Sequence, residues 1–138
     1  MIRMGGLLAS VSMLTGILIY LFLRPHEAVA VRMVAGWMPA LRSMRALTVG
    51  TVTQPFVVFS LPNGLWAFAY AVLMASLWKD GPSGQRLFWM ASIPVVGLGY
   101  EIMQYAGVFP GTFCPGDILA CLLGVCFGFV LSIQWEDG

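Results

Sequence analysis

Charged residues are scarce in this sequence. The 138-residue chain has seven Lys or Arg and six Asp or Glu residues, so that only 9% of it is charged. Soluble domains contain roughly 25% charged residues, and the low fraction therefore excludes a soluble globular protein. The net charge of +1 also excludes a nucleic-acid-binding surface, which needs clustered basic residues. Because 59% of the residues are hydrophobic, we predict one membrane-embedded domain over residues 1–138 with the lipid bilayer as its main partner.

Residues that catalyse reactions or bind metal ions are also few. His26 is the only histidine, and we expect it to be solvated at the membrane surface. The three cysteines, Cys114, Cys121 and Cys126, fit no common zinc spacing. The sequence contains no nucleophile elbow, metalloprotease motif, phosphate-binding loop or dinucleotide fingerprint. We therefore expect neither a metal site nor a bound cofactor, and these absences favour a non-catalytic protein over an enzyme.

Long apolar runs are what the sequence has instead. Each is close to the roughly 17–25 residues that a helix needs to cross a bilayer. The first run is longer than the roughly 7–15 residues of a signal-peptide core, and we expect it to be a permanent anchor. The expected fold is all-α, a bundle of four transmembrane helices. The predicted spans lie at about residues 5–23, 62–78, 87–109 and 117–135.

The segment at about residues 28–61 does not follow this pattern. It carries Arg32, Arg42 and Arg45 among apolar residues, which is typical of a helix lying along the membrane surface. Its second part, residues 46–61, is rich in β-branched residues and has a proline near its middle. That part can form a short span, a re-entrant piece or an interfacial segment, and we therefore predict an interfacial or re-entrant segment here.

Counting basic residues bears on these alternatives. If residues 46–61 do not cross the membrane, three basic residues lie on one side and four on the other. If they cross, six share one side and Arg3 stands alone, a distribution that the positive-inside rule favours. This topology places the turn at residues 110–116 outside the cytoplasm. In both topologies that turn lies on the side opposite Lys79 and Arg86.

Polar residues inside the apolar runs predict a site. Glu101 and Gln104 share one helix face, about 12 and 7 Å from the predicted end of their span. A charged side chain at such depth costs about 3 kcal/mol, so it is expected to face protein or water. Asp117 and Asn63 lie at the same end of the bundle. Asp117 is expected to act mainly as a helix cap, although a cap can still point its spare oxygen into a site. Glu101 can be a purely structural carboxyl, but we favour a binding pocket to which all four residues contribute.

Small residues recur on the last predicted span. Gly116, Ala120, Gly124 and Gly128 are spaced every four residues, so that one helix face carries no bulky side chain. Such a stripe lets another backbone approach closely. We predict that the preceding span is its partner, because the connecting turn is short. A second copy of the chain or a foreign subunit is the alternative.

The last hairpin of the sequence carries a motif of polar and small residues. It reads Glu101-x-x-Gln104, then Gly111-Thr112, Asp117, Gly124 and Gly128. In this order it resembles the last hairpin of the VanZ-like family of small membrane proteins, over about thirty residues and with weaker support from residues 61–70. Thr112 stands where the family usually has arginine, and Cys121 where it usually has asparagine. The resemblance implies a multi-pass protein of the bacterial cytoplasmic (inner) membrane.

Two functional hypotheses follow. In the first, a VanZ-like protein binds the headgroup of an envelope lipid or a glycan-lipid in its polar pocket. In the second, the chain is a non-catalytic accessory subunit of a larger membrane protein complex. An enzyme or a transporter is a third, less favoured hypothesis, because four short spans are few for an alternating-access carrier.

Overall fold

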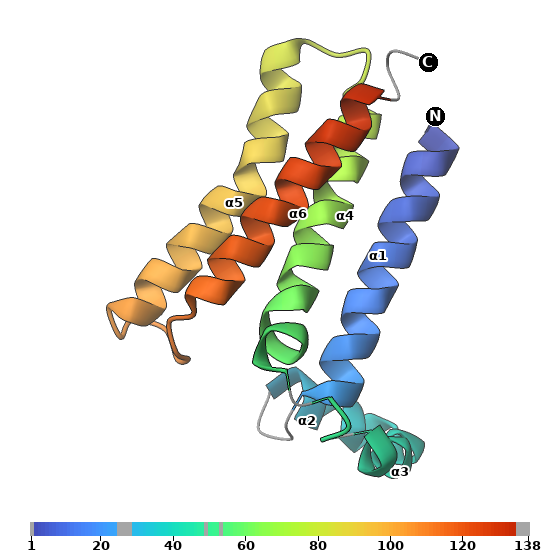
Figure 1. The fold of residues 1–138 in the computed structure, drawn as a ribbon, viewed down its shortest axis with the longest axis vertical. Helices are drawn as coiled ribbons and strands as arrows, with labels where there is room; N and C mark the ends of the chain where they lie inside the picture. The colour runs from blue at the N-terminus through green and yellow to red at the C-terminus, as the bar shows by residue number, and fades with distance from the viewer. Residues whose placement is uncertain (1, 25–28, 49, 53, 135–138) are drawn as a thin grey trace.

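The computed structural model describes residues 2–24, 29–48, 50–52 and 54–134. His26 and the end of the last predicted span, at residue 135, lie outside these ranges. Within them, every regular element is helical, which confirms the predicted all-α class. The elements are α1 (Ile2–Leu23), α2 (Val29–Trp37), α3 (Pro39–Thr48), the π-helical turn η1 (Phe56–Ser60), α4 (Leu61–Leu77), α5 (Ser83–Tyr105) and α6 (Pro115–Gln134). Figure 1 shows the long helices running lengthwise beside one another, with α2 and α3 at one end of the bundle.

Three helices are long and apolar enough to cross a membrane. They are Met4–Leu23, Phe56–Leu77 and Pro115–Gln134, which supports a membrane protein. The fourth long helix, α5, has 23 residues but is less apolar, because it carries Glu101, Gln104 and several small residues. It nevertheless runs between the same two ends of the bundle as its neighbours (Figure 1).

The second membrane-length helix begins earlier than predicted. Pro55 has a φ of −57°, the value that starts a helix, and η1 then continues directly into α4. Residues 46–48 belong to α3, whereas residues 56–60 form the first turn of this longer helix. The stretch 46–61 therefore forms no separate span. Sequence pattern missed this because Pro55 was read as an interruption rather than as a helix start.

This change of boundary overturns the predicted charge distribution. Arg24 and the arginines of α2 and α3 lie at one end of the bundle, whereas Lys79 and Arg86 lie at the other (Figure 1). The six-to-one distribution is therefore wrong. It no longer supports the orientation that places the turn at residues 110–116 outside the cytoplasm. The turn at residues 110–116 does lie at the end opposite Lys79 and Arg86, as both topologies required.

The small-residue stripe of α6 packs against α4. A Cβ atom added to Gly124 would overlap the carbonyl oxygen of Gly64 and lie 3.0 Å from the backbone nitrogen of Phe68. A Cβ atom added to Gly128 would lie 2.8 Å from the Cβ atom of Ala71. The prediction that α5 is the partner is therefore wrong. The physical reason is that α4 presents its own small residues, so that two bare faces meet backbone to backbone.

Helices α2 and α3 cover the end of α1. Their inner face buries Val31 and Arg45, both 0% exposed. Arg45 Nη2 donates to the carbonyl oxygen of Arg24 at 2.6 Å, and Thr48 Oγ1 donates to that of Phe22 at 3.0 Å, so both cap the last carbonyls of α1. Desolvation lowers the pKa of Arg45 from its ordinary value, although an arginine stays protonated in proteins.

The outer face of α2 and α3 is apolar. Trp37 is 86% exposed and Leu47 80% exposed, and Met33 is also exposed. The two helices therefore have one face packed on the bundle and one that carries large apolar side chains outward.

Candidate functional site

A pocket of about 800 Å³ opens at the end of the bundle where α2 and α3 lie. It forms where α1 and α5 end and where η1 and α6 begin. The four side chains predicted from the sequence (Glu101, Gln104, Asp117 and Asn63) all line it. Further polar side chains line it as well, among them Arg24, Ser60, Tyr100 and Thr112.

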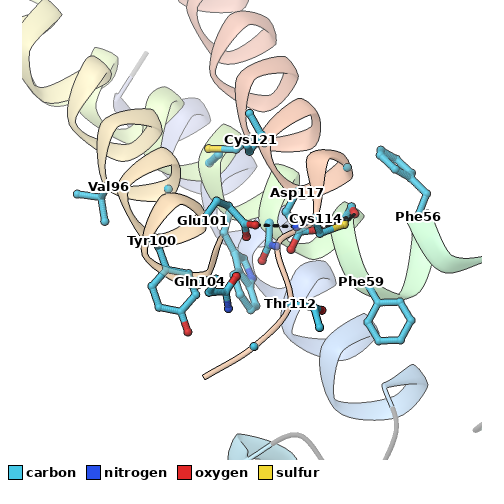
Figure 2. Close-up of a pocket in the computed structure, with 18 of the residues that line it drawn as sticks. Phe56, Phe59, Val96, Tyr100, Glu101, Gln104, Thr112, Cys114, Asp117 and Cys121 are labelled. Atoms are coloured by element: carbon cyan, nitrogen blue, oxygen red, sulfur yellow. Dashed lines mark hydrogen bonds between the residues drawn. The ribbon is translucent and has the colours of Figure 1, made fainter. Parts of the chain in front are cut away.

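Glu101 connects α5 to the loop before α6. Its side chain is only 6% exposed, and its Oε2 accepts a hydrogen bond from the backbone N–H of Cys114 at 2.8 Å. Figure 2 shows Glu101 extending from α5 toward Cys114 and Asp117. The Glu101 carboxyl therefore holds the loop before α6 and also lines the pocket.

Gln104 fixes the same loop one turn further along α5. Its Nε2 donates to the carbonyl oxygen of Pro110 at 3.3 Å. Gly111 follows with a φ of +136°, and a Cβ atom at this position would overlap the Gln104 amide. Only glycine combines this backbone conformation with such a close approach. The glycine of the Gly111-Thr112 pair is therefore needed to place Thr112 at the pocket.

Asp117 is held from the side of η1. Ser60 Oγ donates to Asp117 Oδ1 at 2.6 Å, a short distance typical of a hydrogen bond to an ionised acceptor. Asp117 lies in the first turn of α6, where the helix dipole favours a negative charge. Gly116 lets the two elements approach, because a Cβ atom there would lie 2.8 Å from Ser60 Oγ. Gly116 therefore extends the close contact of α6 from α4 onto η1, beside the pocket.

Arg24 contributes a positive charge that sequence reasoning missed. Its Nη2 donates to the carbonyl oxygen of Phe59 at 2.9 Å. The guanidinium also lies 4.5 Å from the ring centroid of Tyr20 and 5.4 Å from that of Phe59. Its buried Nε has no hydrogen-bond partner among the described residues. Arg24 thus places a cation in the pocket.

Apolar side chains extend the pocket toward the middle of the bundle. Trp66 and Ala67 line it on the α4 side, and Ile93 and Val96 line it on the α5 side. Ala67 lies eleven residues beyond Phe56, which is about 16 Å along a helix. The pocket is therefore polar at the helix ends and apolar toward the middle of the bundle.

The geometry suits binding better than covalent chemistry. Ser60 is the hydroxyl nearest to a base, but it is 2% exposed and already donates its proton to Asp117. Within the part of the chain that the structure describes, no three His, Cys, Asp or Glu side chains gather as metal ligands would. What the pocket offers a ligand is hydrogen-bonding groups and charges of both signs.

Comparison with known proteins gives no further assignment. No protein-family model, no curated protein and no solved structure matches this chain. Its function is therefore argued from the geometry of the pocket.

Sequence reasoning did not find Arg24, Ser60 or the N–H of Cys114. No local pattern marks them, because each reaches the pocket from an element that only the fold brings near. The one available signal for Ser60 was its position as a lone hydroxyl at the end of an apolar stretch.

Proposed function

We propose that this protein is a four-span membrane protein of the VanZ-like type, located in the bacterial cytoplasmic membrane, whose pocket binds the headgroup of an envelope lipid or a glycan-lipid. The observation that carries the proposal is the gathering of Glu101, Gln104, Asn63 and Asp117 in one pocket. These residues come from three helices and lie far apart in the sequence. A chain with only 9% charged residues places two carboxylates, an amide pair and an arginine together here.

The proposal includes α5 as a fourth span. This helix has the length of its neighbours and runs beside α6 between the two ends of the bundle (Figure 1). The two polar residues in its second half, Glu101 and Gln104, line the pocket. Polar groups that face protein or a water-filled cavity are compatible with a membrane span.

The position of the pocket fits an amphiphilic ligand. Its polar end lies at the helix ends, where a bilayer has its headgroups, and its apolar wall continues along α5 to Ile93, eight residues or about 12 Å beyond Glu101. Its volume of about 800 Å³ is within the roughly 300–1,000 Å³ of ordinary ligand sites. A lipid can therefore enter with its headgroup at Glu101 and its chains beside Ile93 and Val96.

A pair of variants on one loop tests this proposal. Thr112→Trp adds bulk where the loop lines the pocket, whereas Phe113→Trp changes a neighbouring residue that does not line it and that packs on Tyr105. Each protein is purified in mild detergent, and lipids that remain bound are identified by native mass spectrometry. We expect Thr112→Trp to lose bound lipid and Phe113→Trp to keep it. Equal lipid content in both variants would contradict a lipid site in this pocket.

The second candidate is an accessory subunit of a membrane complex. It is favoured by the outward face of α5, where Val95 and Ile102 are largely exposed and a Cβ atom on Gly99 would meet nothing within 4 Å. A small residue flanked by apolar ones suits close approach of another helix. Purification from mild detergent with a second polypeptide in fixed stoichiometry would support this role over the first.

A further inference from the structure

The π-helical turn η1 holds one charged residue on each side of the pocket. The carbonyl oxygen of Phe59 accepts the hydrogen bond of Arg24, and the hydroxyl of the next residue, Ser60, donates to Asp117. Two consecutive residues thus fix a cation and an anion in the same pocket. Isolated π-turns are rare and occur frequently at functional sites.

Neither charge is neutralised by the other. Arg24 contacts a carbonyl oxygen and two aromatic rings, and Asp117 accepts a hydroxyl proton. Both residues also line the pocket. In the part of the chain that the structure describes, the buried Nε of Arg24 has no hydrogen-bond partner. A ligand that carries both an anionic and a cationic group can therefore complement both residues.

We propose that the ligand is an aminophospholipid, whose headgroup joins a phosphate to a primary ammonium. This assignment rests on the proposed function and names the ligand class for the same pocket. The phosphate lies against Arg24, because a guanidinium binds phosphate oxygens through several N–H groups. The ammonium lies against Asp117, and Glu101 and Asn63 provide further oxygen acceptors beside it.

The apolar lining supports a lipid over a water-soluble compound with the same headgroup. Trp66, Ala67, Ile93 and Val96 continue the pocket away from the charged end. A soluble phosphate ester would leave this wall uncovered, whereas acyl chains bury it. The aromatic rings of Phe56 and Phe59 stand beside the polar end (Figure 2) and add apolar surface there.

The test compares lipids with identical acyl chains and different headgroups. Wild-type protein in mild detergent is offered phosphatidylethanolamine, phosphatidylcholine and phosphatidylglycerol, and bound lipid is counted by native mass spectrometry. We expect about tenfold more binding of phosphatidylethanolamine, because the choline nitrogen has no N–H to donate and glycerol carries no cation. Binding of all three to the same extent would overturn the aminophospholipid assignment while leaving a headgroup site in place. Binding of none would contradict the proposed function itself.

Variants of Arg24 and Asp117 test separately which headgroup charge each residue binds. Asp117→Asn keeps an oxygen that accepts the Ser60 hydrogen bond but removes the negative charge, so we expect it to lose the preference for the amine and still bind phosphate lipids. Arg24→Gln is expected to weaken binding of all three lipids. If the glutamine variant does not fold, Arg24→Lys, which keeps the positive charge, is measured in its place. An unchanged headgroup preference in Asp117→Asn would overturn the proposal.

A final arm separates the lipid from its soluble headgroup. Glycerophosphoethanolamine, which has the same headgroup without acyl chains, is added in equal concentration as a competitor. We expect it to displace less than a tenth of the bound phosphatidylethanolamine, because it leaves the apolar wall exposed. Displacement of half or more would overturn the assignment of a lipid ligand.

Discussion

Replacing Gly124 with alanine should destabilise the bundle although it adds only one methyl group. The new Cβ atom would overlap the carbonyl oxygen of Gly64 and lie 3.0 Å from the nitrogen of Phe68. Both neighbours are backbone atoms, so no side chain can rotate away, and α4 and α6 must separate along their contact. Overpacking a close contact typically costs about 1–3 kcal/mol, and backbone neighbours place Gly124→Ala near 3 kcal/mol.

The matched control is Gly99→Ala on α5. A Cβ atom at Gly99 meets nothing within 4 Å, and alanine favours a helix over glycine by roughly 0.5–1 kcal/mol. The same chemical change should therefore be neutral or slightly stabilising there. Leu122→Ala is a second control, because Leu122 is 42% exposed and lies off the small-residue face.

Unfolding in mixed micelles measures the difference. Each variant is titrated with increasing fractions of sodium dodecyl sulfate, and loss of structure is followed by circular dichroism. We expect the unfolding equilibrium of Gly124→Ala to shift about a hundredfold toward the unfolded state, with Gly99→Ala and Leu122→Ala close to wild type. Coincident transitions for Gly124→Ala and Gly99→Ala would refute the close packing of α4 on α6.

Three further outcomes are expected. Cysteines introduced at Asp80 and Thr112 should react with an impermeant thiol reagent from opposite faces of the membrane, because α5 lies between the two positions. If both cysteines react from the same face, α5 does not cross the membrane. A spin label on Trp37→Cys should report a depth at the lipid headgroups by electron paramagnetic resonance, and full exposure to water, as at Asp80, would contradict an interfacial α2. Glu101→Gln keeps an oxygen for the N–H of Cys114, so we expect stability within about 0.5 kcal/mol of wild type and reduced lipid binding. Unchanged lipid binding in this variant would leave Glu101 with a structural role alone.

Much of the fold followed from hydropathy and turn composition. The first and last spans lie within two or three residues of their predicted bounds, because uncharged runs of about twenty residues have few alternatives to a membrane helix. The start of the second span was missed by six residues. Pro55 appears as a break in a sequence pattern, whereas in the fold its fixed φ begins the helix that η1 continues.

The partner of α6 was not predictable from loop length. A short turn brings α5 and α6 into the same region, but it does not decide which faces are bare enough for backbones to touch. Gly64 and Ala71 on α4 carried that signal, since they are spaced to meet Gly124 and Gly128. In a bilayer, where apolar burial does not drive helices together, closeness of approach decides the partner.

Some residues of the candidate site could be predicted from the sequence and others could not. Glu101, Gln104, Asp117 and Asn63 were recognisable because polar residues are conspicuous in apolar sequence. Arg24 was not, because an arginine that ends a span is ordinary and its place in the pocket depends on the packing of α1 beside η1.

The contact between α4 and α6 also bears on how the chain is made. Roughly sixty residues separate the end of α4 from the end of α6, which corresponds to roughly 3–12 s of ribosomal synthesis at roughly 5–20 residues per second. During that interval the small-residue face of α4 is in the bilayer without its partner. The tightest contact of the finished protein is therefore the last to form, and until it does that face is open to any other helix with a small-residue stripe.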